Sequence, residues 1–335
     1  MGALAPLAVS VGDPAGVGPE LIAEAWLQRE AEGLPAFFAV GGAALLQQAA
    51  ASRGHTIAVK KVATAEQALP TFAGALPVLG ADDMPFDPGK PDIEGARFAL
   101  GSLSRATQLA RSGQAAALVT GPIAKSRLAA AGFEQPGQTE FVADACKMDR
   151  EEAVMMLAGP SLRTVPITVH CALADVPDQL SSALIVRRAR IVSQALTADF
   201  GIARPRLAIC GLNPHAGEDG RFGDEESRII GPAIEALHAE GLDVAGPYPA
   251  DSLFAPHSRT GFDAALCMYH DQALIPVKAL DFDRAVNITL GLPVVRTSPD
   301  HGTAFAIAGK AQADPGAMIA AIRMAGDCAA RRALA

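Results

Sequence analysis

Short apolar runs alternate with amphipathic stretches along the whole chain, and this alternation constrains the fold more than any other feature. Apolar runs bounded by turn residues predict strands at 7–11, 37–40, 115–120, 154–157, 164–170, 206–210, 264–269 and 286–290. Apolar residues at helical spacing predict helices at 19–28, 93–111, 140–147, 184–198, 225–239 and 315–332. Strands that alternate with helices are typical of an α/β protein with a largely parallel sheet.

The length of 335 residues is enough for two lobes of ordinary domain size. Hydrophobic residues make up 50% of the chain and charged residues 19%, which is a globular balance and not a disordered one. Gly and Pro mark a possible boundary at 130–137, and the last predicted helix can return to the first lobe. We therefore expect a first lobe of residues 1–132 with 303–335, and a second lobe of residues 133–302.

Charge and cysteine usage restrict the partners and the compartment. A net charge of −8 and a pI near 5.4 argue against a nucleic acid or an anionic membrane as partner. No apolar run reaches the roughly 18 residues of a membrane span, and the N-terminus lacks the basic region of a signal peptide. The 5 cysteines are odd in number and form no CxxC pair, which argues against a disulfide framework. We expect a cytoplasmic protein.

A glycine-rich loop, GDPAGVGPE at 12–20, follows the first predicted strand. Its spacing matches neither GxGxxG nor the P-loop GxxxxGK[ST], so both common nucleotide-binding signatures are absent from this loop. Taken alone, such a loop is more often a tight strand-to-helix turn than a binding site. Its position at the carboxyl end of a strand is nevertheless where α/β sheets build their sites.

Three of the 7 histidines, His170, His215 and His270, stand at or just after the end of a predicted strand. The carboxyl ends of parallel strands line one crevice, so these imidazoles can converge. Three neutral imidazoles suit Zn²⁺ or another borderline divalent ion, with positions left for substrate oxygens. Each histidine alone also fits a hydrogen-bonded residue at a strand end, and the residues by themselves leave both interpretations open.

Cysteines and carboxylates lie beside these histidines. Strand alternation predicts that the sulfurs of Cys171 and Cys267 point to the opposite face, as small buried hydrophobic groups. Asp271 and Asp251 can accept a hydrogen bond from an imidazole or ligate a harder ion. Solvated loop carboxylates are the equally good alternative for both.

Lys278, Asn287 and Arg296 stand in a stretch otherwise dominated by apolar residues, Gly and Pro. Cations beside a site bind a carboxylate or phosphate and fix its orientation. The alternative is a surface Lys and Arg whose stems cover apolar surface. The polar, small-residue segment 296–304 is expected to be a loop whose backbone can approach a cofactor.

Several segments together resemble the 4-hydroxythreonine-4-phosphate dehydrogenase family of pyridoxal phosphate biosynthesis. They run in the family's order over nearly the whole chain: GDPAGVGPE at 12–20, TGPIAKSRLAAAG at 120–132, GQTEFVAD at 137–144, GLNPHAGEDGRFGDEE at 211–226, YPADSLF at 248–254, YHDQALIPVK at 269–278 and NITLGLPVVRTSPDHGTAF at 287–305.

The resemblance implies an isocitrate/isopropylmalate-dehydrogenase-like fold. Two α/β/α lobes would enclose the active site in the cleft between them and at the interface of a homodimer, with the cofactor on the first lobe and metal, substrate and dimer contacts on the second. One metal ligand can come from the partner subunit. The cofactor is NAD or NADP, with one divalent ion (Zn, Mg or Co), and the substrate is a small phosphorylated hydroxy acid.

The resemblance also implies roles for particular residues. Catalysis is expected of His170, His215, His270 and Lys278, and the same three histidines bind the metal, with Asp251 and Asp271 as possible supporting carboxylates. Substrate binding is expected of Gln138, Thr139, Lys278, Asn287 and Arg296. Cofactor binding is expected of Asp300, His301, Gly302 and Thr303.

Two positions depart from the family pattern. Most relatives carry His where this chain has Gln138, and glutamine cannot become cationic. Relatives often carry an acidic residue where this chain has Ala306, beside the expected cofactor loop. Both departures bear on which substrate and cofactor contacts this chain makes.

The expected reaction is metal-dependent, NAD(P)-linked oxidation of 4-hydroxy-L-threonine 4-phosphate to 2-amino-3-oxo-4-phosphooxybutanoate. That product decarboxylates to 3-amino-2-oxopropyl phosphate. A nearby alternative is a relative that oxidises threonate or erythronate 4-phosphate or a cis-dihydrodiol dicarboxylate. Alternatives of other classes are a phosphotransacetylase-like acyltransferase and a binding protein without turnover.

Overall fold

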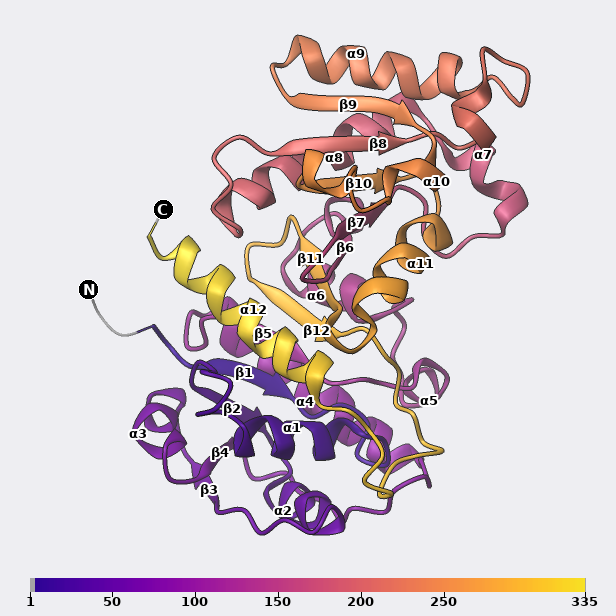
Figure 1. The fold of residues 1–335 in the computed structure, drawn as a ribbon. Coiled ribbons are helices and arrows are strands. Elements are labelled where there is room, and N and C mark those ends of the chain that lie inside the picture. The colour runs from indigo at the N-terminus through magenta and orange to yellow at the C-terminus, as the bar shows by residue number, and fades with distance from the viewer. Residues whose placement is uncertain (1–3, 335) are drawn as a thin grey trace. The chain divides into compact units, whose positions relative to one another are not determined.

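The computed structural model describes residues 4–334 and divides into two compact units (Figure 1). Unit 1 runs to Ala153 and takes up Leu292–Leu334, and unit 2 is Val154–Gly291. The expected lobes were 1–132 with 303–335 and 133–302. The first boundary between the units thus lies later in the chain than expected, and the second lies earlier. Helix α6 (Gln138–Ala145) packs on α4 (Ile93–Arg111), which keeps 133–153 in unit 1. Strand β12 pairs with β5 of the same unit, which keeps 292–302 there too.

The strands of unit 1 lie in the order β3-β4-β2-β1-β5-β12, and the pairings within the unit are parallel. Their bounds are β1 (Leu7–Ser10), β2 (Phe37–Val40), β3 (Val59–Val62), β4 (Leu76–Leu79), β5 (Leu118–Thr120) and β12 (Arg296–Pro299). The central strands β1, β2 and β5 are buried at every residue. This is why they read in the sequence as continuous apolar runs and not as alternating ones.

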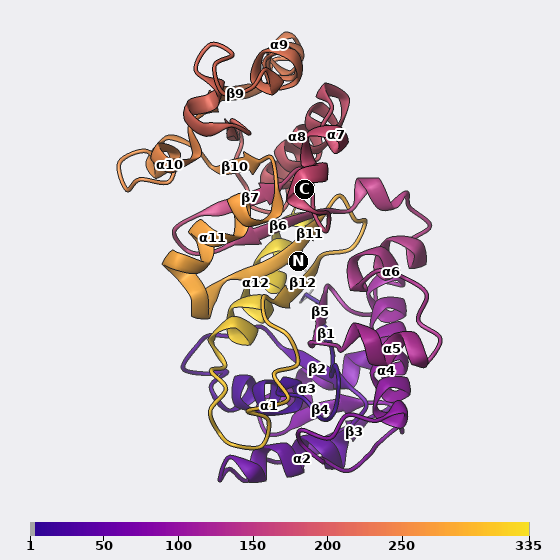
Figure 2. The same ribbon diagram turned by 90° about the vertical axis from the view of Figure 1, so that its right-hand side faces the viewer.

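Helices cover both faces of the unit 1 sheet (Figure 2). Helices α4, α5 and α6 lie on one face, and α1 and α12 lie on the other. The helices are α1 (Gly18–Leu27), α2 (Ala43–Ser52), α3 (Ala68–Phe72), α4, α5 (Lys125–Ala130), α6 and α12 (Gly316–Arg332), with short 3-10 turns η1 (Ala65–Gln67) and η2 (Arg150–Glu152). Helix α4 begins at the predicted residue because the Asp92 carboxylate accepts the Gly95 N–H at 2.7 Å, which caps its first turn.

The strands of unit 2 lie in the order β11-β6-β7-β10-β8-β9. Their bounds are β6 (Val154–Ala158), β7 (Arg163–Pro166), β8 (Arg206–Cys210), β9 (Asp243–Tyr248), β10 (Ala264–Cys267) and β11 (Val286–Leu290). Strands β7, β10, β8 and β9 are parallel neighbours, whereas β6 is antiparallel to both β7 and β11. The expectation of a largely parallel sheet is confirmed, with this antiparallel part as the exception.

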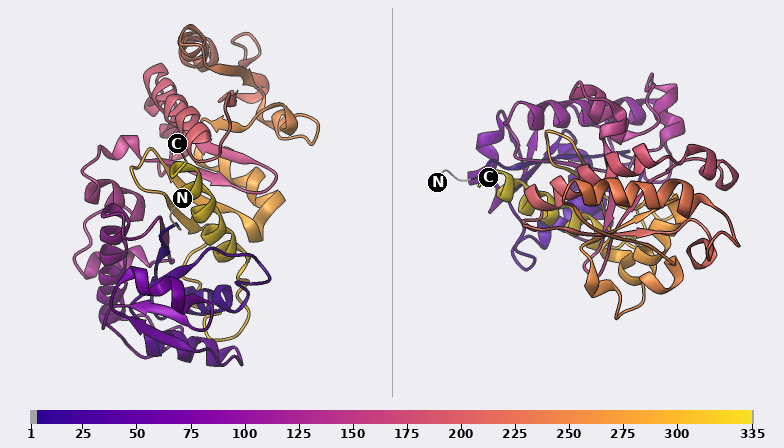
Figure 3. Two further views of the ribbon diagram at one scale, coloured as in Figure 1. Left: turned by 90° about the vertical axis from the view of Figure 1, so that its left-hand side faces the viewer. Right: turned by 90° about the horizontal axis from the view of Figure 1, so that it is seen from above.

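Helices also lie on both faces of the unit 2 sheet (Figure 3). Helix α8 packs on β6, β8 and β11, and α11 packs on β7 and β10 from the other side. The elements are α7 (Val176–Gln179), α8 (Ser182–Ala198), α9 (Gly231–Ala239), α10 (Ala250–Leu253) and α11 (His270–Asp281), the 3-10 turns η3 (Leu173–Asp175), η4 (Pro214–Gly217), η6 (Arg259–Gly261) and η7 (Phe282–Arg284), and the π-helical turn η5 (Glu226–Ile230).

Several predicted elements end elsewhere. The strand expected at 164–170 stops at Pro166, and the one at 264–269 stops at Cys267. The helix expected at 225–239 is two pieces, a π-helical turn followed by α9, whose Pro at the first turn lacks the N–H that would continue a regular helix. The segment 296–304, expected as a loop, begins with strand β12, whose residues are all buried. This strand could not be predicted from local sequence, because its side chains are polar and it forms through long-range pairing with β5.

No helix in the range 4–334 is long and apolar enough to cross a lipid bilayer.

Candidate active site

The three predicted histidines follow three neighbouring parallel strands of unit 2. His170 comes after β7, His215 lies in η4 after β8, and His270 is the first residue of α11 after β10. The strand order β7-β10-β8 brings all three segments to the same edge of the sheet. This is the edge at which α/β folds bind ligands.

His170 and His270 face each other across a pocket in unit 2. Their ring centroids are 5.8 Å apart, and the rings are tilted by 42°. The pocket has a volume of about 330 Å³ and is lined by Val169, His170, Cys171, Leu173, Val176, Tyr269, His270 and Asp271. Two imidazoles on an otherwise largely apolar wall can supply two nitrogen ligands to one borderline divalent ion.

His215 stands apart from this pair. Its nearest ring contact is Phe222, at 6.1 Å between centroids, and it does not line the pocket. Within residues 4–334 no three His, Cys, Asp or Glu side chains are grouped closely enough to hold one metal ion. The described residues of one chain therefore bring together two of the three expected metal ligands, at the His170–His270 pair.

The backbone around His215 is left-handed over five successive residues, 215–219. His215, Ala216, Glu218 and Asp219 have φ values of 51°, 52°, 41° and 55°, and Gly217 has 80°. Each non-glycine residue in this region costs roughly 1–2 kcal/mol. Such strain persists only where surrounding contacts over-determine the conformation, and it collects at functional sites.

The two predicted carboxylates differ in their contacts. Asp271 Oδ1 lies 2.8 Å from His270 Nδ1, and a carboxylate in that place accepts the imidazole N–H. Nε2 of His270 then keeps its lone pair for a ligand, as in the carboxylate–histidine arrangements of metal sites. Asp251 lies exposed in α10.

The cysteine prediction is right for one residue and wrong for the other. Cys267 is buried in β10, with its sulfur 3.8 Å from that of Cys210 in β8, and burial raises the pKa of its thiol well above the usual range. Cys171 instead lines the same pocket as His170. Strand alternation does not separate them because β7 has already ended at Pro166.

A buried arginine forms the centre of a second group, in unit 1. Arg296 on β12 is 4% exposed, and its Nη2 donates to Thr120 Oγ1 at 2.7 Å and to Gln138 Oε1 at 3.1 Å. Its Nη1 lies 3.5 Å from Thr139 Oγ1. Burial lowers the pKa of the guanidinium to about 10, and the Glu140 carboxylate opposes that shift. Arg296 is therefore a cation at neutral pH.

Gln138 is held at both ends of its amide. While Oε1 accepts from Arg296, Nε2 donates to the Gly121 carbonyl oxygen at 3.0 Å. The orientation of the amide is thus fixed, and its neutral oxygen faces the guanidinium. A histidine in this place could not present a carboxamide oxygen to the arginine.

The other two predicted substrate residues belong to unit 2. Lys278 is half-buried in α11, the helix that His270 begins. Asn287 lies on β11, and its buried Oδ1 accepts no hydrogen bond from any residue in the range 4–334. A buried polar atom without a protein partner is a candidate contact for a ligand or an ordered water.

Two loops that the sequence singled out separately lie against each other in unit 1. Val17 N donates to the Thr303 carbonyl oxygen at 3.0 Å, which joins the glycine-rich loop to the expected cofactor segment. A Cβ at Gly16 would lie 2.8 Å from that same oxygen, so the close approach requires glycine there. Of the four predicted cofactor residues, Thr303 is buried and Gly302 is exposed, while His301 Nδ1 lies 3.0 Å from the Gly302 oxygen.

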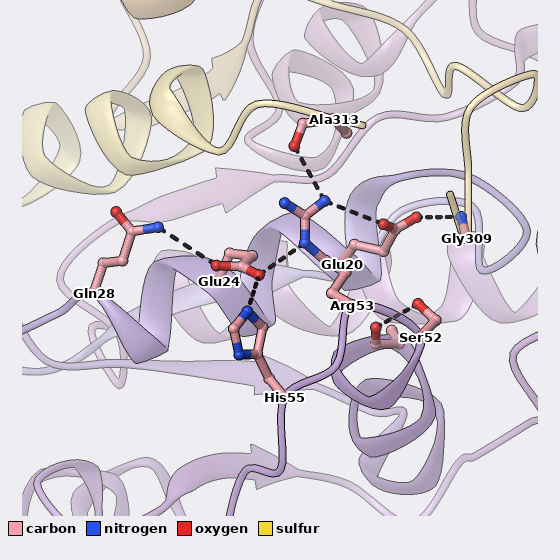
Figure 4. A network of polar contacts seen from close by, with 9 residues as sticks. Glu20, Glu24, Gln28, Ser52, Arg53, His55, Gly309 and Ala313 are labelled. Carbon is pink, nitrogen blue, oxygen red and sulfur yellow. Dashed lines mark hydrogen bonds and ion pairs between the residues drawn. The ribbon is translucent and has the colours of Figure 1, made fainter. Parts of the chain in front are cut away.

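A network of buried charges anchors the chain beyond this segment (Figure 4). Glu20, which is 0% exposed, accepts from Gly309 N at 2.6 Å and pairs with Arg53 Nη1 at 3.3 Å. Arg53 also pairs with Glu24 through Nε at 2.7 Å and donates to the Ala313 oxygen at 3.1 Å. The first helix after the glycine-rich loop thereby fixes the segment that follows Thr303.

Comparison with known proteins decides the family. The sequence matches the family model described as pyridoxal phosphate biosynthetic protein PdxA over residues 34–325. A 4-hydroxythreonine-4-phosphate dehydrogenase of Erythrobacter litoralis is 60% identical over 328 residues, which cover 98% of each protein. The protein of that name from Zymomonas mobilis is 50% identical, covering 98% of this chain and 96% of its own. The chain belongs to the PdxA family. The family predicted from the sequence motifs is confirmed.

Solved structures agree with PdxA membership. The 4-hydroxythreonine-4-phosphate dehydrogenase of Klebsiella pneumoniae superposes with a TM-score of 0.85 at 36% identity, covering 97% of this chain and 99% of its own. A terephthalate 1,2-cis-dihydrodiol dehydrogenase of Burkholderia xenovorans gives 0.65 at 32% identity, covering 96% and 98%. A branched-chain phosphotransacylase of Enterococcus faecalis gives 0.51 at 12% identity, covering 96% and 99%. This last likeness shows a shared fold alone, so the acyltransferase alternative gains no support for its activity.

Sequence reasoning missed one polar partner in this PdxA chain. Thr120, at the end of β5, accepts the shorter of the two hydrogen bonds from Arg296 Nη2. It opens the TGPIAK stretch that contributed to the family resemblance, which was the available signal. Its pairing could not be predicted because it depends on β12 lying beside β5.

Proposed function

We propose that this chain catalyses the NAD-linked, metal-dependent oxidation of 4-hydroxy-L-threonine 4-phosphate. The product, 2-amino-3-oxo-4-phosphooxybutanoate, is a β-keto acid that loses CO₂ to give 3-amino-2-oxopropyl phosphate, a precursor for pyridoxal 5′-phosphate. The observation that carries the proposal is 60% identity over 98% of both chains to a 4-hydroxythreonine-4-phosphate dehydrogenase. Membership of the family makes the chain a dehydrogenase that acts on a CH–OH group.

Arg296 and its partners are assigned to the anionic end of the substrate. A buried, permanently charged guanidinium whose forked N–H groups are already aligned by Thr120 and Gln138 suits phosphate or carboxylate recognition. Thr139, with its hydroxyl beside the same guanidinium, adds a neutral donor. Lys278 and the unsatisfied oxygen of Asn287 are assigned to the remaining polar groups of the substrate.

The divalent ion is assigned to His170, His215 and His270. Histidine ligands favour a borderline ion such as Zn²⁺ or Co²⁺ over Mg²⁺, which prefers oxygen. When bound, such an ion lowers the pKa of a coordinated hydroxyl and polarises the carbonyl that replaces it. Because His215 does not join the His170–His270 pocket, we propose that the ligand set is completed by a histidine of a second subunit.

The chain's own groups prepare the substrate for hydride loss. Asp271 holds the Nδ1 proton of His270 and so presents the other nitrogen of that ring. The largely apolar wall of the pocket lowers the local dielectric constant and so strengthens polar contacts made against it. NAD, which accepts the hydride, is assigned to the segment Asp300, His301, Gly302 and Thr303, which lies against the glycine-rich loop.

A substrate panel tests this function. The initial rate of NADH formation is measured with 4-hydroxythreonine 4-phosphate, threonate 4-phosphate, erythronate 4-phosphate and a cis-dihydrodiol dicarboxylate, each with NAD or NADP. Each arm is repeated after chelation and after re-addition of Zn²⁺, Mg²⁺ or Co²⁺. The proposal expects the first substrate to give the highest kcat/KM, with activity lost on chelation. A higher kcat/KM for another substrate, or full activity of metal-free protein, would overturn the corresponding part.

We also propose a cytoplasmic homodimer. Large apolar side chains are exposed in unit 2 on and beside α11: Ile275 is 64% exposed, Leu280 is 43% exposed and Phe282 is 70% exposed. Leu173, on the rim of the histidine pocket, is 68% exposed. Exposed apolar groups gathered on one element are typical of a protein–protein interface. A second copy seated there would lie next to the metal-binding residues.

A further inference from the structure

Glu226 is a buried carboxylate outside the set of residues assigned above. It begins the π-helical turn η5 and is 7% exposed. Its Oε1 accepts from the backbone N–H groups of Leu212 and Asn213, both at 2.8 Å, and its Oε2 accepts from Asn213 Nδ2 at 2.9 Å. Three donors therefore converge on one carboxylate, and all three belong to the start of the loop that carries His215.

The loop is closed tightly around this carboxylate. A Cβ at Gly217 would lie 2.6 Å from Glu226 Oε2, and a Cβ at Gly211 would lie 3.1 Å from Oε1. Glycines before and after His215 thus allow the carboxylate to fill the inside of the turn. We attribute the left-handed conformation of residues 215–219 to this internal contact. Without such contacts, residues other than glycine would relax to a less strained conformation.

Gln272 joins this loop to the segment of the second histidine. It is buried in the first turn of α11, and its Oε1 accepts from Met268 N at 2.6 Å, just before His270. Its Nε2 donates to the Gly211 oxygen at 2.8 Å, at the first residue of the His215 loop. One amide therefore spans the ends of β10 and β8, with each of its two polar atoms committed.

We propose that Glu226 and Gln272 are positioning residues that fix the turn carrying His215 and the start of α11 carrying His270, and thereby set the metal affinity of the sites to which these histidines contribute. Neither touches the metal-binding nitrogens. Glu226 shapes the turn that carries one imidazole, and Gln272 sets the spacing between the two strand ends. The inference rests on the proposed function of these histidines as metal ligands, and it adds two residues that hold them in place.

Glu226→Gln is the first test. The amide keeps the size of the carboxylate and one acceptor oxygen, but its NH₂ replaces the other oxygen and must face at least one of the three donors. The dissociation constant for Co²⁺ is measured on the full-length, metal-free protein by calorimetry, together with the visible absorption of bound Co²⁺. We expect Co²⁺ binding to weaken by roughly 10–100-fold, the usual effect of losing a group that orients a metal ligand. Glu235→Gln, on the exposed face of α9, is the matched control and should bind as the wild type does.

Gln272→Glu tests the second contact and covers the case in which Glu226→Gln does not fold. The carboxylate can still accept from Met268 N, but it places an anion against the Gly211 oxygen. We expect weaker Co²⁺ binding and a changed absorption band, while circular dichroism stays that of the wild type. Wild-type affinity and spectrum in either folded variant would overturn the role of that residue.

Amide hydrogen exchange separates this inference from the metal assignment itself. In the metal-free protein, the Leu212 and Asn213 amides should exchange slowly in the wild type and faster in Glu226→Ala, which removes both acceptor oxygens. Unchanged exchange there would contradict the role of Glu226 in ordering the loop. If His215→Ala instead binds Co²⁺ as tightly as the wild type, the metal assignment of His215 is wrong, whatever the exchange data show.

Discussion

Gln138 accepts a hydrogen bond from Arg296, with 3.1 Å between its Oε1 and the arginine Nη2. A buried cation is thus aligned by a neutral amide that carries no titratable proton. The substrate recognition proposed for this group therefore involves no protein titration near neutral pH, because the pKa of Arg296 is lowered only to about 10. The chain places a neutral amide beside one fixed positive charge.

Gln138→His should therefore introduce a pH dependence. A protonated imidazole adds a second cation for the phosphate, but the nearby guanidinium holds the pKa of that imidazole below its ordinary value of about 6.5. We expect the variant's KM relative to that of the wild type to fall by about threefold to tenfold as the pH drops below 6.5. Taking the ratio of the two KM values removes the titration of the substrate phosphate. Gln135→His, at an amide that donates to Asp144, should give a flat ratio. A flat ratio for Gln138→His as well would contradict the assignment.

Asp13 gives a pH dependence of stability. It is 2% exposed, and burial raises the pKa of its carboxyl although the Ala15 N–H donates to it at 3.0 Å; the negative Asp92 adds to the rise. The folded protein therefore binds a proton that the unfolded chain has already lost, and this contribution to stability disappears as pH rises from 3.8 through the folded-state pKa.

Asp13→Asn should consequently gain stability relative to the wild type as the pH rises. The amide keeps an oxygen for the Ala15 N–H and has no charge to bury. Urea unfolding of both proteins between pH 3.5 and 7 is the measurement. The difference in unfolding free energy should increase as the pH rises above 3.8 and level off once the pH exceeds the folded-state pKa. A difference that stays constant over this window would show that Asp13 titrates alike in both states.

The ion-pair network of Figure 4 gives a prediction about stability. Arg53→Met leaves the buried carboxylates of Glu20 and Glu24 without their guanidinium, which should cost about 3–5 kcal/mol of unfolding free energy. Lys90→Met breaks an exposed pair with Asp87 and should cost at most about 1 kcal/mol. Chemical denaturation of the two variants compares them directly. Equal losses would mean that the buried network contributes no more than a surface pair.

Local sequence patterns predicted much of the fold, but little of how the histidine segments are arranged and held in place. Helix α4 was predicted to the residue from its amphipathic run, and the structure shows that the Asp92 cap starts it there. Strand β9 was missed because Gly246 and Pro247 interrupt its apolar pattern. Placing the histidines at strand ends needed only the local apolar runs. The order β7-β10-β8, the left-handed turn at His215 and its contact with Glu226 depend on long-range pairing, which periodicity does not encode.

The exposed apolar residues of α11 and η7 lead to a prediction about assembly. An aromatic ring that is 70% exposed, as in Phe282, costs free energy in water and gains it when a second copy covers it. The wild type should therefore sediment at about twice the 34.4 kDa of the chain, and Phe282→Asp should shift it toward the monomer at micromolar concentration, because a charge cannot be buried unpaired. Leu69→Asp, at a side chain 38% exposed in unit 1, should leave the mass unchanged. If the histidine centre is completed by a second subunit, monomeric Phe282→Asp must also bind Co²⁺ more weakly in proportion to its dissociation. A monomer with wild-type Co²⁺ affinity would place the whole ligand set within one chain.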